Sequence, residues 1–196
     1  VWPNPAVGCV IVKDEHVVGR GWTQQGGRPH AETEAMSRAG AAARGATAYV
    51  TLEPCSHHGE TPPCAGALVD AGVTRVVAAM TDPDPRVAGQ GLSALRAAKI
   101  AVDVGVCEDE AHALNRGYLK RLSDGLPLVT LKTAITTDGR IATESGESQW
   151  ITGAESRAEA HRLRADHDAI AVASATALAD DPELTCRLPG MRGRSP

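Results

Sequence analysis

The stretch TLEPCSHHGETPPC, residues 51–64, decides how this sequence is interpreted. It places two cysteines, two adjacent histidines and three prolines in fourteen residues, which is too stiff and too polar for a core helix or strand. A loop of this composition indicates a cross-link or a site that holds a ligand. The central question is therefore what Cys55 and Cys64 bind.

The composition limits the classes of partner. The chain has 196 residues and a net charge of −4, with no block of Lys or Arg, so we do not expect it to bind nucleic acid. No apolar run reaches the roughly 20 residues that span a bilayer, and no signal peptide opens the chain, so we expect no membrane association and a cytoplasmic location. The chain begins without methionine, close to a strand-like segment, and ends abruptly after RLPGMRGRSP, so we expect it to be a fragment.

Helices and strands alternate in the first part of the sequence. A hairpin of two strands, 7–12 and 16–22, is predicted first, joined by the polar turn KDE. Regularly spaced alanines then predict a helix from His30 to Gly45. The further expected elements are strands at 47–53, 75–80 and 100–106 and helices at 64–72, 91–98 and 108–124. Strands separated by helices of this length predict parallel βαβ units, and we expect an α/β fold with a three-layer αβα architecture in residues 1–125.

The tripeptide GLP interrupts this pattern, and a second series of elements follows. One strand is expected at 128–134 and another at 168–173. Thr152 begins the sequence TGAE, which predicts a capping box and a helix through about Asp166. We therefore predict a domain boundary near residue 125 and a second α/β domain in residues 126–196.

Three potential metal ligands, His30, Cys55 and Cys64, fall beside predicted helix starts or strand ends. Cys55 follows the strand TLE, and Cys64 opens a helix, where the positive end of the helix dipole stabilises a thiolate. Two sulfurs and one imidazole suit Zn²⁺, and three protein ligands leave a fourth position for water. The sequence therefore predicts a zinc site.

Glu32 is the candidate catalytic residue beside this site. It stands two residues after His30, and because residues two apart on a helix differ by about 200° in direction, His30 has to lie at the helix entry for Glu32 to reach the metal. An H-x-E motif followed by P-C is typical of zinc nucleobase deaminases, in which the Glu moves protons without binding the metal. Here Cys64 follows Cys55 after eight residues, SHHGETPP, instead of the usual two.

Other interpretations stay open from the residues alone. Cys55 and Cys64 are compatible with a disulfide, although no secretory signal favours one. They are also compatible with a closed, structural zinc site that includes His57 or His58. His30 by itself is compatible with an ordinary surface histidine. The whole pattern would also fit another zinc nucleobase deaminase, or a non-catalytic module that zinc stabilises and that only oligomerises.

Four segments together resemble the deaminase half of the bifunctional riboflavin-biosynthesis deaminase–reductases: PNPAVGCVIV, GRPHAETEA, TLEPCSHHGETPPC and DPDPRVAGQG. This half belongs to the cytidine-deaminase-like superfamily, and the long spacing between the two cysteines is typical of this branch. Four later segments resemble the start of the reductase half, which is similar to dihydrofolate reductase: LKTAITTDGRIA, SGESQWITG, HRLRADHDAI and TALADDPELTCRLPG. The resemblance covers essentially the whole chain.

For residues 1–125 the resemblance implies a small-molecule substrate. It implies that this domain removes the 2-amino group of 2,5-diamino-6-ribosylamino-4(3H)-pyrimidinone 5′-phosphate, with Glu32 passing protons to the ring and to the departing ammonia. Asn4, in PNP, is a candidate contact for the pyrimidine edge, although a turn asparagine between prolines is equally compatible. For His57 and His58, a solvent-facing position and a contact to the substrate phosphate both stay open.

For residues 126–196 the resemblance implies an NADPH-dependent reductase that converts the ribosyl side chain to ribityl. The positions that match the family's NADP contacts are Ala134, Trp150, Thr176 and Asp180, and those that match its contacts to the sugar-phosphate substrate are Ser148, Arg164, Leu184 and Arg187. Guanidinium groups pair well with phosphate, which supports the two arginines. Ordinary surface charge at the arginines and a simple turn at Asp180 are the alternatives.

Two features of the second part depart from the family. Ala173 and Ala175 stand where the family usually has glycine near the cofactor. The chain also ends before the family's glycine-rich pyrophosphate-binding segment, so we expect deamination to survive in this fragment, whereas reduction and tight NADPH binding should fail. Unpaired strand edges favour association, and the family implies a homo-oligomer.

Overall fold

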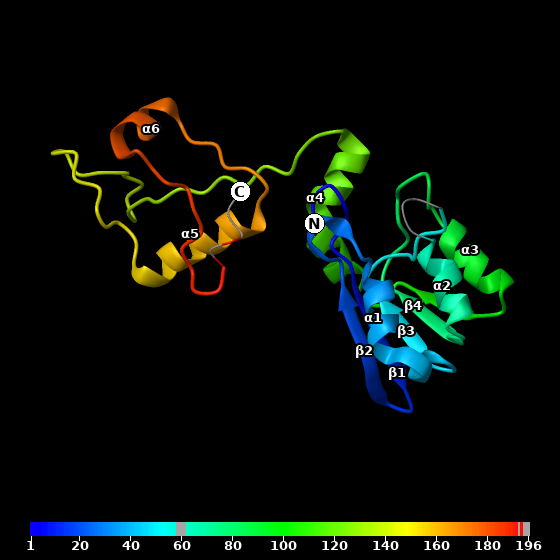
Figure 1. Cartoon of the computed structure of the whole chain (residues 1–196). Coiled ribbons are helices and arrows are strands. Elements are labelled where there is room, and N and C mark those ends of the chain that lie inside the picture. The colour runs from blue at the N-terminus through cyan, green and yellow to red at the C-terminus, as the bar shows by residue number, and fades with distance from the viewer. Residues whose placement is uncertain (58–61, 192, 194–196) are drawn as a thin grey trace. The chain divides into compact units, whose positions relative to one another are not determined.

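The computed structural model describes residues 1–57, 62–191 and 193. The chain divides into two compact units, Val1–Leu128 and Val129–Pro196, and each is described by itself. The elements of the first unit are β1 (Gly8–Lys13), β2 (His16–Trp22), the 3₁₀ turn η1 (Gln25–Gly27), α1 (Ala31–Ala39), the 3₁₀ turn η2 (Gly40–Ala43), β3 (Thr47–Val50), α2 (Cys64–Asp70), β4 (Arg75–Ala78), α3 (Gln90–Ala97), β5 (Ala101–Val104) and α4 (Glu108–Asp124) (Figure 1). They follow the predicted order, with ends that differ by a few residues from those predicted.

Five strands form one sheet in the order β2-β1-β3-β4-β5. β1 pairs antiparallel with β2 and with β3, whereas β3, β4 and β5 run parallel. Parallel strands end at the same edge of a sheet, so the segments that follow β3 and β4 emerge side by side. The loops that carry Cys55 and Asp82 both leave the sheet at this edge.

One hydrophobic core joins the sheet to three helices. Alternate residues of each strand point to the same face of the sheet. The buried members of this core include Ile11, Ala48 and Val76 of the strands and Ala35, Leu68 and Leu95 of α1, α2 and α3. A smaller cluster links Ala111 of α4 to Leu52 and Met80, which lie just past the ends of β3 and β4. The α/β class predicted from the alternation of elements is confirmed.

Two glycines of β2 allow α1 to lie directly on this strand. A Cβ atom at Gly19 would lie 2.3 Å from the carbonyl oxygen of Ala35, and one at Gly21 would lie 2.2 Å from the carbonyl oxygen of Ala31. Cβ atoms do not come this close to backbone oxygens in proteins. The sequence GRG in β2 therefore fixes how closely the helix approaches the sheet.

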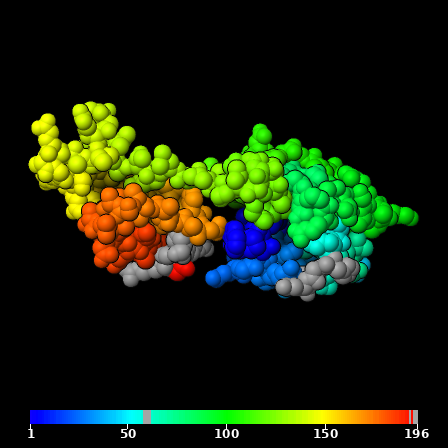
Figure 2. Space-filling model, turned by 90° about the horizontal axis from the view of Figure 1, so that it is seen from above, coloured from blue at the N-terminus to red at the C-terminus, as the bar shows by residue number. Residues whose placement is uncertain are grey.

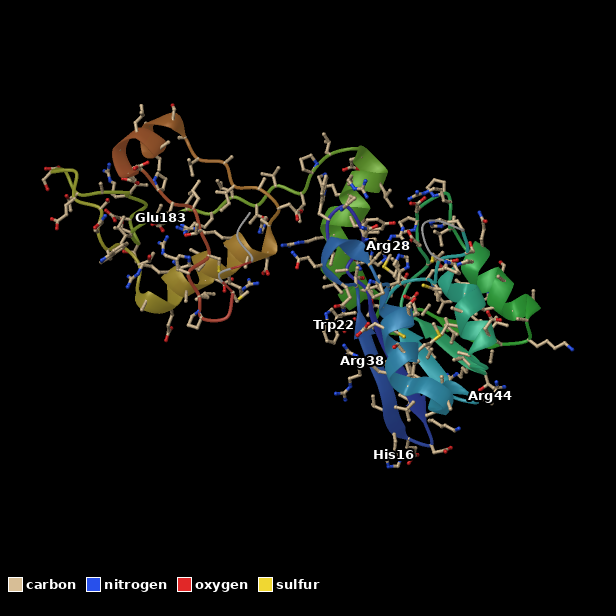
Figure 3. The ribbon with its side chains drawn as sticks, in the orientation of Figure 1. His16, Trp22, Arg28, Arg38, Arg44 and Glu183 are labelled. Carbon is tan, nitrogen blue, oxygen red and sulfur yellow. The ribbon has the colours of Figure 1, made fainter. Side chains whose placement is uncertain are left out.

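A polar contact also joins α1 to β2. The guanidinium carbon of Arg38 lies 4.8 Å from the centre of the Trp22 ring (Figure 3). The same side chain donates to the carbonyl oxygen of Arg20 at 3.1 Å and pairs with the Glu34 carboxylate at 2.6 Å. A cation over an aromatic face is attracted to it, and this arrangement covers part of an otherwise exposed tryptophan.

The second unit contains two helices, α5 (Ala154–Asp166) and α6 (Ser174–Asp180). The strands predicted at 128–134 and 168–173 are wrong, because no strand is assigned among the described residues of this unit. Val129 and Leu131 are 81% and 86% exposed, so their alternating apolar pattern has no buried face to occupy. An extended segment becomes a strand only when another segment pairs with it. No helix in the described part of either unit is long and apolar enough to cross a membrane.

The capping box predicted at Thr152 is also wrong. The N-cap of α5 is Gly153, and no side chain caps this helix start. The carbonyl oxygen of Thr152 instead accepts a hydrogen bond of 2.5 Å from Nη1 of Arg157. A threonine one residue before the N-cap is not in the position from which a hydroxyl satisfies the first free N–H groups of the helix.

Candidate metal centre and the cavity beside it

The ends of three elements place the candidate ligands. His30 is the N-cap of α1 and has an extended backbone, as the sequence requires for Glu32 to reach the site. Cys55 lies in the loop after β3, and Cys64 is the first residue of α2. Pro63, also extended, is the N-cap of α2 and so starts the helix at Cys64. Cys64 is buried, and the other two ligands are half-buried.

The donor atoms of these three residues converge. Nδ1 of His30 lies 3.7 Å from Sγ of Cys55 and 3.3 Å from Sγ of Cys64, and all three ligand atoms lie within 4.8 Å of one another. In a tetrahedral site, a nitrogen and a sulfur at the usual Zn–N and Zn–S lengths are about 3.6 Å apart. The donor set and its spacing therefore fit Zn²⁺.

The geometry also bears on the alternative interpretations. Cys55 and Cys64 are free thiols, so they do not form a disulfide. His57 is not part of the ligand cluster found among the described residues, and His58 lies outside those residues. Within the described part of the chain, the cluster therefore has three ligands and no fourth protein ligand closes it.

The two sulfurs differ in their affinity for a proton. Sγ of Cys55 accepts hydrogen bonds from the Cys64 thiol and, at 3.4 Å, from the Cys64 backbone N–H, and these contacts together with His30 lower the pKa of Cys55 to about 4. The hydrogen bond between the two thiols and burial raise the pKa of Cys64. The hydrogen bond with Cys55 raises the pKa of His30. Cys55 is therefore the first of the two to become a thiolate, the form that binds metals.

Glu32 lies in the first turn of α1, next to the ligand cluster, and is only 4% exposed. Burial raises its pKa to about 7, and the negative charge of the Cys55 thiolate adds to the shift. Glu32 lines the same cavity as His30 and Cys55. A carboxyl group with a pKa near neutrality can both accept and donate a proton.

A cavity of about 310 Å³ opens beside the ligand cluster. Its walls come from the N-terminal segment, from the loop after β4 and from α4; their polar lining residues are Asn4, Asp82, Asp84, Arg86, Tyr118 and Arg121. Asn4 is the residue predicted to contact the pyrimidine, and its side chain packs on Gly27. A Cβ atom at Gly27 would lie only 1.9 Å from Nδ2 of Asn4. The glycine thus leaves the space that the Asn4 side chain occupies.

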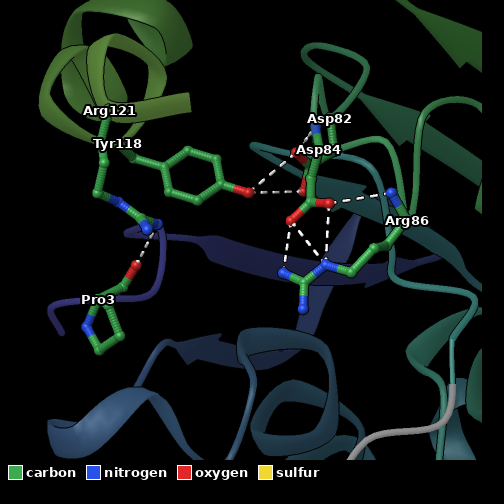
Figure 4. Close-up of polar contacts among 6 residues, drawn as sticks. All are labelled: Pro3, Asp82, Asp84, Arg86, Tyr118 and Arg121. Atoms are coloured by element: carbon green, nitrogen blue, oxygen red, sulfur yellow. Dashed lines mark hydrogen bonds and ion pairs between the residues drawn. The ribbon is translucent and has the colours of Figure 1, made fainter. Parts of the chain in front are cut away.

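One face of α4 holds the N-terminal wall of the cavity. The Asn115 side chain accepts a hydrogen bond of 2.9 Å from the N–H of Ala6 and donates one of 3.0 Å to the carbonyl of the same residue. Six residues further on, Nη2 of Arg121 donates to the carbonyl of Pro3 at 2.9 Å (Figure 4). The space-filling view shows the N-terminal residues lying against α4 (Figure 2). The sequence predicted this helix but not these contacts. Asn115, Tyr118 and Arg121 follow one another at intervals of three residues, and side chains at this spacing are neighbours on a helix surface.

The same helix face holds the loop after β4. Tyr118 donates a hydrogen bond of 3.1 Å to Asp82, whose Oδ1 also accepts the N–H of Asp84 at 2.9 Å (Figure 4). Arg86 pairs with the Asp84 carboxylate at 2.5 Å. Burial raises the pKa of Asp82, whereas the Arg86 guanidinium lowers the pKa of Asp84. Two adjacent carboxyl groups of the cavity wall therefore differ in charge state as pH falls.

A cavity of about 630 Å³ lies in the second unit, and two of the predicted substrate contacts, Arg164 and Arg187, line it. Nη1 of Arg164 donates to the carbonyl of Thr185 at 3.0 Å. The backbone N–H of Arg187 donates to Nδ1 of His161 at 3.3 Å. The other basic lining residues are Lys132 and Arg157. Glu155 and Glu159 line the cavity as well, so four basic side chains stand against two carboxyl groups.

The remaining predicted contacts of the second unit do not line this cavity. Ser148, Thr176 and Asp180 are exposed, and Ala134 and Leu184 are half-buried. Trp150 is 71% exposed, and the guanidinium carbon of Arg157 lies 4.7 Å from the centre of its ring. The structure brings two of the eight predicted residues together in one cavity, and the other six do not line it.

Known families match both units. Residues 2–80 match the cytidine and deoxycytidylate deaminase zinc-binding region, and residues 127–195 match the RibD C-terminal domain. The riboflavin biosynthesis protein RibD of Escherichia coli (strain K12) is 58% identical over 185 residues, which are 94% of this chain and 50% of that protein. The chain belongs to the RibD family. It spans about half the length of the curated RibD relatives it matches.

Solved RibD structures are similar in fold. RibD of Acinetobacter baumannii (form 1) is 52% identical and has a TM-score of 0.87, with 95% of this chain and 52% of that chain covered. The diaminohydroxyphosphoribosylaminopyrimidine deaminase/5-amino-6-(5-phosphoribosylamino)uracil reductase of Thermotoga maritima is 41% identical and has a TM-score of 0.91, with 96% of this chain and 54% of that chain covered. The resemblance to the riboflavin-biosynthesis family and the predicted fold class are confirmed. The roles of the individual site residues stay predictions.

Proposed function

We propose that the first unit is the deaminase half of a RibD-type enzyme. It hydrolyses 2,5-diamino-6-ribosylamino-4(3H)-pyrimidinone 5′-phosphate at the 2-amino group and releases ammonia. The observation that carries this proposal is the meeting of His30 Nδ1 with the sulfurs of Cys55 and Cys64 beside the buried carboxyl group of Glu32. The description of the Thermotoga maritima relative as such a deaminase supports the choice of substrate.

His30, Cys55 and Cys64 would hold the metal. A Zn²⁺ ion bound there supplies Lewis acidity, which lowers the pKa of a coordinated water to about 7. Glu32 accepts a proton from the attacking water and delivers it to a ring nitrogen; a second proton passes through the same carboxyl group to the departing amine. The buried position of Glu32 keeps its pKa at about 7, so its protonated and ionised forms are both populated at neutral pH.

The lining of the first cavity supports a phosphorylated pyrimidine as substrate. Its volume of about 310 Å³ is in the range of small-molecule sites. The Asn4 amide offers one donor and one acceptor group to a ring edge. Arg28, Arg86 and Arg121 line the same cavity together with four carboxyl groups, and guanidinium groups offer the paired donors that suit a phosphate. His57 lines it too, which favours a substrate contact over a purely solvent-facing position.

For the second unit we propose a part of the NADPH-dependent reductase half, which reduces the ribosyl side chain to ribityl. The boundary between the two activities is proposed at residue 125, so that residues 126–196 belong to the reductase. The cavity that Arg164 and Arg187 line supports a phosphate-bearing substrate. The further proposed contacts are Ser148 and Leu184 for the substrate and Ala134, Trp150, Thr176 and Asp180 for NADP.

We also propose that the protein is a homo-oligomer. Exposed apolar residues such as Val129 and Leu131 support this, because surfaces of this kind are often covered by a second chain. Light scattering on the purified protein measures the oligomer mass. A monomer at all concentrations would contradict the proposal.

Release of ammonia from the diaminopyrimidine nucleotide tests the deaminase. Zinc-loaded wild type is compared with Glu32→Gln and with Glu34→Gln, a control on the same helix whose carboxylate pairs with Arg38. We expect the first variant to retain zinc and to lose at least about 100-fold in rate, the usual effect of removing a general acid–base. The control should stay within about twofold, because Glu34 does not line the cavity.

Two results would contradict this proposal. Equal rates in wild type and Glu32→Gln, with zinc still bound, would favour the non-catalytic zinc module. Faster release of ammonia from cytidine or from a free nucleobase than from the diaminopyrimidine nucleotide would favour a different zinc deaminase.

A further inference from the structure

Glu53 is a buried carboxylate with an unusual set of partners. It lies in the loop after β3, three residues beyond Val50, and is 4% exposed. Its Oε2 accepts the backbone N–H groups of Asp82 at 3.2 Å and Gly89 at 2.9 Å. Its Oε1 accepts those of Gly91 at 2.8 Å and Leu92 at 3.2 Å. One side chain thus holds the loop after β4 at Asp82 and Gly89 and also binds the first turn of α3.

Two of these contacts cap a helix from a distance. Gly91 and Leu92 lie in the first turn of α3, where backbone N–H groups have no partner within the helix. The N-cap residue is Gly89, which has no side chain that could accept them. A carboxylate at this position satisfies these donors and interacts favourably with the positive end of the helix dipole. Glu53 therefore does for α3 what an aspartate or serine does at an ordinary N-cap.

The position of Glu53 connects this cap to the candidate metal centre. Its neighbour Pro54 lies against the start of α3, since a Cβ atom at Gly91 would lie 1.9 Å from the Pro54 carbonyl oxygen. The next residue is the metal-ligand candidate Cys55. Glu53 itself lines the cavity, and the segment that it holds begins at Asp82 and supplies one wall. Glu53 therefore lies two residues before the candidate ligand Cys55 in the sequence and also holds the cavity wall formed by residues 82–87.

We infer that Glu53 is a positioning residue, which fixes the wall formed by residues 82–87 relative to Cys55 and thereby sets the fit of the substrate; this inference rests on the proposed deaminase function. Its negative charge is required as well as its size. All four partners are N–H donors, and a carboxylate offers only acceptors. In Glu53→Gln one oxygen becomes an NH₂ group, which would face two N–H donors and lose both hydrogen bonds.

Glu53→Gln tests the inference by two independent measurements on the zinc-loaded protein. In the ammonia-release assay we expect KM to rise about tenfold or more while zinc content is unchanged, since two hydrogen bonds to a charged group are lost at the cavity wall. By hydrogen exchange, the amides of Asp82 and Gly89, or those of Gly91 and Leu92, should exchange at least about tenfold faster, whereas those of β3 should not change. Glu34→Gln is the matched control and should change neither quantity.

Other results would overturn the inference. A lower melting temperature with KM and the exchange of these amides unchanged would mean that Glu53 only stabilises the fold. If Glu53→Gln does not fold, Glu53→Asp keeps both acceptors on a shorter side chain, and an unchanged KM in that variant would equally refute the inference. If wild type does not deaminate the nucleotide, the proposed function fails, but the exchange measurement still decides whether Glu53 holds the segment.

Discussion

The two units of this chain differ in how firmly they hold their candidate site residues. In the first unit, a five-stranded sheet and three helices enclose a core, and the candidate ligands lie at two helix starts and in the loop after β3. In the second unit, Cys186 is the buried apolar residue among the described positions, and neither α5 nor α6 contains a buried residue. The difference teaches that a motif assembles into a site when a packed core fixes the ends of the elements that carry it.

The largest expected effect comes from removing one candidate metal ligand of the first unit. In Cys55→Ser a weakly acidic hydroxyl replaces a thiolate whose pKa is about 4, so we expect zinc affinity to fall by more than about 100-fold and deamination to be lost. Bound zinc is measured by elemental analysis. Cys107→Ser, at an exposed cysteine of the same unit, should keep zinc and activity. Zinc retained in Cys55→Ser, or lost in Cys107→Ser, would contradict the proposed centre.

A pair of leucines sharpens the contrast in packing. Leu68 of α2 is 0% exposed, whereas Leu178 of α6 is 88% exposed. Leu68→Ala should lower the free energy of unfolding of the first unit by about 2–5 kcal/mol, because it leaves a cavity in the core. Leu178→Ala should change stability by less than about 0.5 kcal/mol. Urea denaturation followed by hydrogen exchange reports on each unit separately, and equal effects of the two substitutions would remove the contrast.

Two adjacent glycines test the fit of the cavity wall. Both have a positive φ, 77° at Gly26 and 85° at Gly27, but a Cβ atom meets Asn4 only at Gly27 and meets nothing at Gly26. Gly27→Ala should displace the Asn4 side chain and lower kcat/KM about tenfold, a change of about 1.4 kcal/mol in transition-state binding. Gly26→Ala carries similar backbone strain without the clash and should keep its kcat/KM. Equal losses in both variants would attribute the effect to strain and not to Asn4.

The ion pair of Arg86 and Asp84 gives the smallest expected effect. Arg86 lowers the pKa of Asp84 in the folded state, so the pair stabilises the fold above the ordinary Asp pKa of about 4, and this contribution is lost as pH falls through the lower folded value. It amounts to at most about 1 kcal/mol, because the Arg86 side chain is 72% exposed. Urea denaturation at about pH 7 and about pH 3 measures it.

A matched pair of variants isolates this pH dependence. Asp84→Asn should lose less stability than wild type on acidification, since the depressed carboxyl group is gone. Arg86→Ala removes the guanidinium that lowers the pKa of Asp84 and should weaken the pH dependence in the same way. An Asp84→Asn variant that follows the wild-type curve would show that this ion pair does not contribute.

The sequence predicted most elements of the first unit because their patterns match the environment that the fold gives them. The strand at 16–22 and the helix at 108–124 have the bounds that the structure shows. The convergence of His30, Cys55 and Cys64 also followed from reasoning about helix starts and strand ends. Contacts that depend on loop backbone could not be predicted in this way. Glu53 is an example, because no pattern in the sequence indicates which N–H groups its carboxylate will meet.

In the second unit, the sequence predicted strands that the structure does not form. The segment LVTLKTA has β-branched and alternating residues, as a strand should, and it is nevertheless unpaired. Strand propensity describes a side chain that fits a half-buried pleated surface, and it gives no information on whether a partner strand is present. The helix start at Gly153 was likewise displaced by one residue from the prediction, since a capping motif fixes a helix start only when its hydroxyl reaches the free N–H groups.

The close contact between the glycines of β2 and α1 has a consequence for the candidate site at the start of that helix. Gly21 touches the carbonyl of Ala31, the residue that separates His30 from Glu32. A single methyl group on this outermost strand would push the first turn of α1 outward and carry the imidazole and the proton carrier with it. The absence of side chains at Gly19 and Gly21 thus sets the distance between β2 and the helix turn that carries His30 and Glu32.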